Sequence, residues 1–373
     1  MSTKENLIFF NPSIEGGGVT KNLFALVNDL VKKKFNIFFC TYYKYIKNKS
    51  FIKIYKFNKN IKIIYPFLNI LENSRVYKII TCFIKITFYN FKNKNIIISF
   101  QANIFAIIAA KITGSKIIIR CNTSPDKYIK NFISKKIFYY FYSRADGIIV
   151  TSKSFKDKFL KFFNLDCYIH KQILNKEEIV RKSKKKIVFD FFKNKKTLKL
   201  ISVGRLVDQK NQITLLKSIK KIIKYRPVEL LLIGSGKDEK KIRQFIYSNN
   251  LTDYIKIINF TPNPFPYIKL SDVFILTSKY EGNPNILLET AILKKLIIST
   301  DCNVGPREIL QNGKGGFLVK VGDYDNIFKI LLKLNLKSKS IITKIKSSYL
   351  YVCQNFKKNN TQEFINILRK VSK

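Results

Sequence analysis

Two carboxylates, Glu281 and Glu289, flank the predicted start of a helix within residues 278–290. An apolar run leads into this stretch, and Asn283 and Pro284 have the residue types of an N-cap and a first helical position. A helix start that follows a strand attracts anions, because its free N–H groups and its dipole favour negative charge. Carboxylates beside an anion would repel it unless they bind another part of the ligand, such as hydroxyl groups. A ligand with central phosphates and hydroxyl-rich rings at both ends, as in a nucleotide sugar, fits this pattern.

A second candidate for phosphate binding is the glycine-rich turn formed by Gly16, Gly17 and Gly18, which follows an apolar strand at residues 7–10. Glycines let the backbone approach a phosphate closely. They also serve simply to tighten a strand-to-helix connection. The turn matches neither the G-x-G-x-x-G fingerprint nor a P-loop, so the glycines alone leave both interpretations open.

Polar side chains follow two further predicted strands of the N-terminal half. Gln101 and Asn103 come after a strand at residues 96–100, and the next strand, at residues 116–120, ends at Arg120 and is followed by Asn122. Open parallel sheets bind ligands at the carboxyl ends of their strands, so these four side chains are candidates to line a cleft. The alternative is that each is an ordinary loop side chain with its hydrogen bonds satisfied.

The elements that position these residues alternate between strand and helix along the whole chain, which predicts an α/β fold with two doubly wound, Rossmann-like domains. A length of 373 residues suits two domains better than one. We expect an acceptor-side domain at residues 1–175, a basic linker at 176–196, a nucleotide-sugar domain at 197–340, and C-terminal helices at 341–373 that pack back toward the first domain.

The composition is strongly basic, with a formal net charge of +46, and 46% of the residues are hydrophobic. That hydrophobic content is enough for two cores and excludes a disordered protein. The abundance of Lys, Ile, Asn, Phe and Tyr is what an AT-rich genome produces, and this is the simpler explanation of the charge. A surface this basic is nevertheless attracted to anionic membranes, at about 1 kcal/mol per well-placed Lys or Arg.

The six cysteines are scattered without a C-x-x-C pair, and His170 is the one histidine. This favours a reducing cytoplasm and argues against a metal site or a disulfide framework. We predict no signal peptide and no transmembrane segment, because every uncharged run falls short of the roughly 20 residues that span a bilayer.

Several short motifs appear in an order that resembles the retaining GT-B glycosyltransferases of family 4 (group 1). The similarity is dense over residues 198–323 and sparser in the first domain. The motifs that carry it are Gly204-Arg205 with Lys210, Gly234-Ser235-Gly236, residues 278–285 with Glu289, and Gly313 with Gly316.

This resemblance implies a role for each matching residue. Arg205 and Lys210 would hold the donor pyrophosphate and neutralise the departing nucleotide, helped by the backbone N–H groups of Asn285, Ile286 and Leu287. Glu289 would accept hydrogen bonds from the ribose, and Glu281 from the transferred sugar. Gly16, Gly17 and Gly18 would reach the phosphates from the other domain. The resemblance also implies that the enzyme needs no divalent metal, no other cofactor and no protein nucleophile.

The first domain departs from the family pattern. Many relatives carry a histidine near the sugar, whereas His170 lies just before the linker and is interpreted as structural. Arg120 and Asn122 stand where some relatives have an Arg-x-Asn pair, so we expect them, with Gln101 and Asn103, near the acceptor or the sugar.

The favoured hypothesis is a cytoplasmic glycosyltransferase, peripheral on the inner face of the membrane, that extends a surface polysaccharide, lipopolysaccharide or lipid-linked glycan. A GT-B relative with epimerase or phosphorylase activity is the enzymatic alternative. A basic nucleic-acid-binding protein is the non-enzymatic one, but it leaves Glu281 and Glu289 without a use, so we expect no nucleic acid partner.

Overall fold

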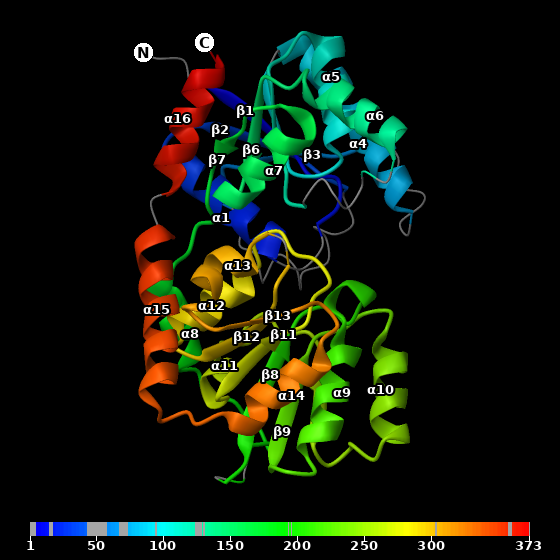
Figure 1. The fold of residues 1–373 in the computed structure, drawn as a ribbon. Coiled ribbons are helices and arrows are strands. Elements are labelled where there is room, and N and C mark those ends of the chain that lie inside the picture. The colour runs from blue at the N-terminus through cyan, green and yellow to red at the C-terminus, as the bar shows by residue number, and fades with distance from the viewer. Residues whose placement is uncertain are drawn as a thin grey trace. The chain divides into compact units, whose positions relative to one another are not determined.

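The computed structural model describes residues 5–14, 18–42, 58–66, 74–93, 95–123, 129, 131–192, 194, 196–302, 304–356 and 360–372. The chain divides into two compact units (Figure 1). The first unit takes residues 1–173 together with 358–373, and the second takes residues 174–357.

The first unit is built on a parallel sheet with the strand order β3-β2-β1-β4-β5-β6-β7. The chain passes from β3 back to the far side of β1, which is the order of a doubly wound sheet. The strands are β1 (Asn6–Phe10), β2 (Asn36–Cys40), β3 (Lys62–Ile64), β4 (Ile96–Ser99), β5 (Ile117–Arg120), β6 (Gly147–Val150) and β7 (Tyr168–Ile169). The helices are α1 (Gly18–Lys32), α4 (Arg75–Asn93), α5 (Asn103–Thr113), α6 (Phe132–Tyr142), α7 (Lys153–Phe163) and α16 (Asn360–Ser372).

The second unit repeats this plan with a parallel sheet in the order β10-β9-β8-β11-β12-β13. Its strands are β8 (Leu198–Val203), β9 (Val228–Ile233), β10 (Ile255–Ile258), β11 (Val273–Leu276), β12 (Leu296–Thr300) and β13 (Phe317–Val319). Its α-helices are α8 (Lys176–Ser183), α9 (Gln212–Ile222), α10 (Glu239–Ser248), α11 (Phe265–Leu270), α12 (Asn285–Ile292), α13 (Pro306–Ile309), α14 (Tyr324–Lys333) and α15 (Lys339–Asn355). Two 3₁₀ turns, η2 (Asp208–Lys210) and η3 (Gln311–Gly313), complete it.

The central strands of the second unit are apolar on both faces. Leu198 and Leu200 of β8 belong to the core cluster beneath α9 and α14, whereas Ile201 belongs to the cluster beneath α11 and α12. Strands buried on both faces in this way are typical of parallel sheets that carry helices on each side. The two parallel-sheet α/β units confirm the predicted fold class.

Two parts of the chain differ from what the sequence suggested. The first residues of the expected linker form α8, and Ile179 of that helix is buried in a core cluster of the second unit. The charged residues of this segment predicted a solvated linker, whereas Ile179 and the partly buried Val180 pack against the core. The C-terminal helices are also divided, since α15 belongs to the second unit and α16 to the first.

Candidate active site

The candidate site of the second unit lies where the chain reverses its direction across the sheet, between β8 and β11. These strands are hydrogen-bonded neighbours, although the chain reaches β11 only after it has formed β9 and β10 on the other side. At such a switch point the loops after the two strands turn apart and leave room for a ligand at the carboxyl edge. The loops that follow β8 and β11 carry Arg205, Lys210 and Glu281.

Close backbone packing fixes the loop that follows β8. A Cβ atom at Gly234, where φ is +154°, would lie 1.9 Å from the Gly204 carbonyl oxygen, and one at Gly236 would lie 2.2 Å from that of Leu206. The amide of Leu206 donates to the Ser235 carbonyl at 3.0 Å. The Gly234-Ser235-Gly236 motif is therefore glycine-rich because two loops meet there backbone to backbone.

Lys210 and Glu281 form an ion pair that joins the two loops. Their side chains are only 15% and 8% exposed, so water screens the pair poorly. The Ser278 hydroxyl donates to the same carboxylate oxygen, Oε1, at 2.6 Å. The Thr277 hydroxyl donates to the Lys210 carbonyl at 3.1 Å, so both partners of the ion pair are held by groups that follow β11.

Arg205 lies on the same loop as Lys210, but its side chain is exposed. Its Nη2 donates to Oε1 of Gln209 at 3.3 Å, and the Gln209 side-chain amide donates to the Tyr280 carbonyl at 3.0 Å. Gln209 thus links the arginine to the loop that carries Glu281. Sequence reasoning missed Gln209, Thr277 and Ser278, and their positions beside the matched motifs were the available signal.

The helix after the second loop, α12, begins one residue later than predicted. Pro284 is the N-cap residue and Asn285 opens the helix, so Asn283 is not the cap. The amide of Leu287 donates to the Pro284 carbonyl at 3.0 Å, which occupies one of the three N–H groups assigned to a phosphate. The side chains of Asn285 and Ile286 are half-buried, while Leu287 packs in the core.

Glu289 lies in the body of α12 and is only 6% exposed. The other buried residues of this helix are apolar or, in Thr290, uncharged, so the Glu289 carboxylate is the exception among them. Buried carboxylates are costly unless they have hydrogen-bonding partners, and so a functional or structural partner must compensate the charge.

The N-terminal candidates are brought together in the first unit, where β4 and β5 are neighbours. Asn103 Nδ2 donates to the Arg120 carbonyl at 3.3 Å and Asn122 Nδ2 donates to the Phe100 carbonyl at 3.2 Å. Gln101 Oε1 accepts from the Ser13 amide at 3.3 Å. These contacts tie together the loops after β1, β4 and β5. Gly18 begins α1 and is exposed, while Gly16 and Gly17 lie outside the described residues.

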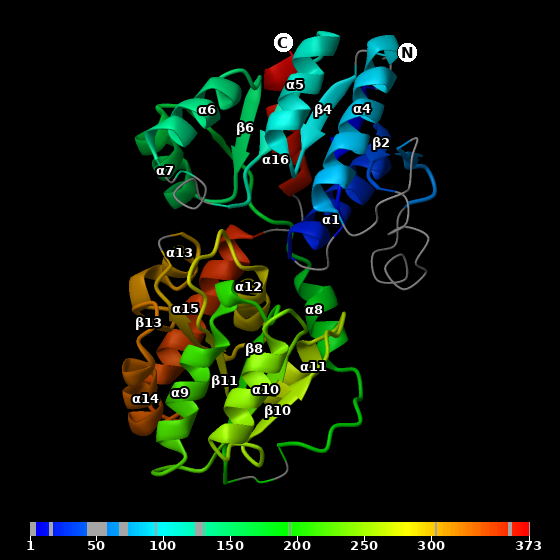
Figure 2. The same cartoon turned by 90° about the vertical axis from the view of Figure 1, so that its right-hand side faces the viewer.

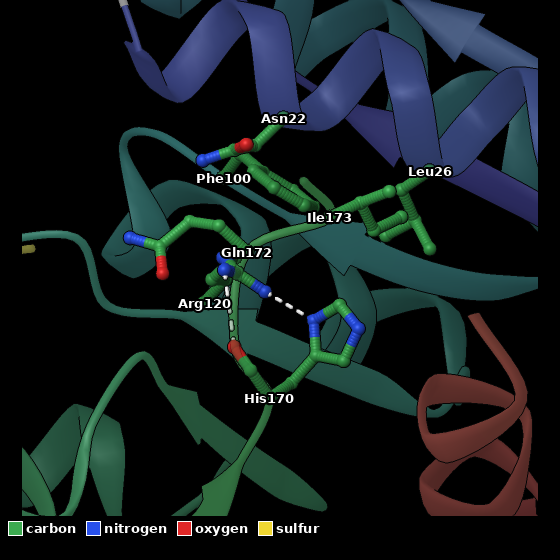
Figure 3. Close-up of a pocket in the computed structure, with 7 residues that line it drawn as sticks. All are labelled: Asn22, Leu26, Phe100, Arg120, His170, Gln172 and Ile173. Atoms are coloured by element: carbon green, nitrogen blue, oxygen red, sulfur yellow. Dashed lines mark hydrogen bonds between the residues drawn. The ribbon is translucent and has the colours of Figure 1, made fainter. Parts of the chain in front are cut away.

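Arg120 is buried and points at His170 (Figure 3). Its Nη1 contacts the imidazole Nδ1 at 2.6 Å and its Nη2 donates to the His170 carbonyl at 3.2 Å. Because an arginine can only donate, Nδ1 accepts, and the Nε2–H donates to the Asn360 carbonyl at 3.0 Å.

Desolvation governs the charge of this pair. Burial lowers the pKa of the Arg120 guanidinium to about 10. Burial and then the charge of Arg120 lower the pKa of His170 to about 3, so the imidazole is neutral at physiological pH. The recess around them is also lined by Asn22, Leu26 and Gln172 and leaves no room for a water molecule. His170 is thus a structural histidine in this structure.

Among the described residues, no group of three or more His, Cys, Asp or Glu side chains is placed to hold a metal ion.

Residues 183–344 match the family described as Glycosyl transferases group 1. An uncharacterized glycosyltransferase of Methanocaldococcus jannaschii is 31% identical over 282 residues, which is 69% of this chain and 66% of that protein. An N-acetylgalactosamine-N,N'-diacetylbacillosaminyl-diphospho-undecaprenol 4-alpha-N-acetylgalactosaminyltransferase of Campylobacter jejuni is 25% identical over 60% of this chain and 62% of its own length. The matched segments thus span just under two thirds of these relatives.

The crystal structure of Anabaena HepE in complex with UDP and glucose superposes with a TM-score of 0.79 over 98% of this chain and 100% of that one, at 14% identity. At this identity the likeness concerns the fold, and it confirms the GT-B architecture that the sequence predicted.

Proposed function

We propose that the whole protein transfers a sugar from a nucleotide-diphosphate sugar to an acceptor. The premise is that residues 183–344, within the second unit, match the group 1 glycosyltransferase family. The observation that carries the proposal is the Lys210–Glu281 pair, held at the switch point of the sheet beside the start of α12. A cation, a carboxylate and a helix N-terminus at one edge offer the contacts that a phosphate between two polyhydroxylated rings needs.

We assign Lys210 and Arg205 to the donor pyrophosphate. Negative charge builds on the departing nucleoside diphosphate as the glycosidic bond breaks, and preorganised cations at that place lower the barrier. The ion pair keeps the Lys210 ammonium in position before the donor arrives, which reduces the rearrangement needed on binding. The amides of Asn285 and Ile286 add the helix N-terminus to the same phosphates.

We assign Glu281 to the hydroxyl groups of the transferred sugar and Glu289 to those of the ribose. A carboxylate accepts hydrogen bonds only, and therefore suits hydroxyl donors. Glu281 is in contact with Lys210, so a sugar bound to one and phosphates bound to the other would be adjacent, as they are in a nucleotide sugar. We propose transfer with retention of the anomeric configuration, in the manner of family 4, and without a protein nucleophile, a divalent metal or another cofactor.

We further propose that the acceptor is a glycan or a lipid-linked sugar in surface polysaccharide or lipopolysaccharide synthesis, met at the cytoplasmic face of an anionic membrane. The relative from Campylobacter jejuni, whose name gives a diphospho-undecaprenol acceptor, supports a lipid carrier. The basic net charge of +46 supports an anionic membrane. Gln101, Asn103, Arg120 and Asn122 remain the candidate acceptor-side residues, although Arg120 is occupied by His170 in this structure.

A thermal-shift screen of nucleoside diphosphates and nucleotide sugars tests the proposal. A ligand at about one hundred times its Kd should stabilise the fold by about 2.7 kcal/mol. Nucleotide release from the donor should be lost in Glu289→Ala and retained in EDTA. The absence of a shift with every nucleotide would contradict the proposal, and activity that EDTA abolishes would contradict the metal-free mechanism.

A further inference from the structure

Helix α4 exposes its more apolar face. The residues that recur along its exposed side are all hydrophobic and are 40–63% exposed: Val76, Ile80, Ile84 and Phe88. The stripe on its buried side is more polar: Lys78, Cys82, Ile86 and Asn90. A helix at the surface of a soluble domain normally does the opposite, with its apolar stripe against the core. The exposed stripe of α4 therefore has the composition of a surface that packs against an apolar partner.

The same character continues over the neighbouring helices. Helix α5 packs against both α4 and α6, and the three lie side by side (Figure 2). On α6 a single side chain, that of Tyr142, is buried. The α4–α6 surface consists of the exposed large hydrophobic side chains of the three helices, which are Val76, Ile80, Ile84, Phe88, Phe91, Ile112, Phe132, Ile133, Ile137, Tyr139 and Tyr140. Large hydrophobic side chains exposed together on neighbouring helices mark an interaction site, unlike scattered single residues.

The charges carried by these three helices are all positive. Helices α4, α5 and α6 contain seven Lys and Arg residues, of which Lys78 is buried, and no Asp or Glu. Beyond α6, Asp146 forms an ion pair with Lys111 at 3.7 Å. Some of these cations lie directly over the aromatic rings. Lys136 Nζ is 4.6 Å from the centre of the Phe132 ring, and the Arg144 guanidinium, just beyond α6, is 3.5 Å from that of Tyr140. An occupant of the surface must therefore accept apolar side chains and positive charges together.

We propose that the α4–α6 surface docks on an anionic lipid bilayer. Aromatic and aliphatic side chains would enter the boundary between headgroups and acyl chains while the lysines and arginines remain at the phosphates, as in helices that lie in the plane of a membrane. A second copy of the chain fits less well, because it would bring an equally cationic surface against this one. The inference deepens the proposed function, because a lipid-linked acceptor lies at a membrane.

The chain contains no tryptophan, so one introduced at the surface becomes a unique fluorescent reporter. We would place it in the full chain at Phe88→Trp and, as a matched control, at Tyr247→Trp on α10 of the second unit, where the native side chain is 81% exposed. Vesicles with roughly one third phosphatidylglycerol in phosphatidylcholine should shift the Phe88→Trp emission to the blue and leave Tyr247→Trp unchanged. Phosphatidylcholine alone should give a much weaker shift.

A partition measurement with matched variants completes the test. Ile80→Gln with Ile84→Gln should lower the vesicle partition coefficient at least about tenfold, since two large apolar side chains lose their burial. Ile342→Gln with Leu350→Gln, exposed hydrophobic positions on α15, should leave it unchanged.

Three results would overturn the docking surface. They are vesicle binding without a Phe88→Trp shift, equal binding to vesicles without anionic lipid, and a Phe88→Trp shift that depends on protein concentration instead of vesicles. The last result would indicate a second copy. The nucleotide thermal shift serves as the independent control for folding and donor binding. If vesicles bind as expected while no nucleotide does, the proposed function fails and the docking surface stands.

Discussion

Neutralising either partner of the Lys210–Glu281 pair should destabilise the protein strongly. Neutralising both should restore most of the stability, whereas the activity should stay lost. Lys210→Met leaves the Glu281 carboxylate, which is 8% exposed, without its cation, and Glu281→Gln leaves the Lys210 ammonium without its anion. Opposite charges about 4 Å apart in a medium of effective dielectric constant near 20 attract by about 4 kcal/mol. Breaking a buried pair from one side costs a similar amount, about 3–5 kcal/mol, because one charge stays buried and uncompensated.

The double variant removes both charges and keeps similar side-chain volumes. Replacing a buried pair on both sides is often close to neutral, so we expect a coupling free energy of about 2–4 kcal/mol between the two positions. For a unit of this size, 1 kcal/mol shifts the Tm by about 2–4 °C, and so each single variant should melt roughly 8–16 °C lower.

Thermal unfolding of the four proteins measures the coupling, and nucleotide release from the donor measures the activity. The control is Lys221→Met, which removes a far more exposed pair with Asp325 in the same unit and should leave the Tm essentially unchanged. Single variants that melt like the native protein would refute the expected stabilisation by the pair. So would a double variant whose loss of stability is the sum of the two single losses. A double variant with native activity would refute its role in transfer.

Three further predictions follow from individual residues. Glu289→Gln should weaken UDP or GDP binding by about 10- to 100-fold, since hydrogen bonds to a charged group contribute about 1.5–3 kcal/mol, and calorimetry should show that the variant no longer distinguishes the nucleotide from its 2′,3′-dideoxy form. Gly234→Ala should lower the free energy of unfolding in denaturant by about 2 kcal/mol or more, because its Cβ would lie 1.9 Å from the Gly204 carbonyl oxygen. Gly204→Ala is the control and should be tolerated, since its Cβ would lie 3.4 Å from the nearest atom. The pKa of His170 falls to about 3 on folding, so the unfolded chain takes up the proton at a higher pH than the folded protein does. The free energy of unfolding should therefore fall by about 1.4 kcal/mol per pH unit as the pH drops from 6 toward 4. His170→Gln should flatten this slope.

The fold could be predicted because its signals are local. Strands such as β4 and β5 are nearly pure isoleucine, and turns and helix starts separate them at regular intervals. The motifs around Arg205, Lys210 and Glu281 were likewise readable in sequence, and the enzyme class they predicted agrees with the family match and the named relatives.

What the sequence could not provide were pairings over long distances in the chain. Lys210 and Glu281 were assigned to different parts of the ligand, and only the fold shows that they contact each other. The hydrogen bond from His170 to Asn360 joins residues 190 positions apart, and no local sequence pattern predicts it. The segment of α8 was predicted to be a linker because it is rich in charged residues. The start of α12 was predicted one residue early because both Asn283 and Pro284 suit a helix start.

The route of the chain through α16 has a consequence for how the protein is made. This helix follows the entire second unit in sequence, yet it supplies Phe364, Leu368 and Val371 to the core of the first unit. On the ribosome, domains generally fold as their residues emerge. Here the first unit, although it is synthesised first, must wait with part of its core uncovered until the second unit has been translated. A premature stop just before α16 would thus spare every residue of the second unit and damage the first.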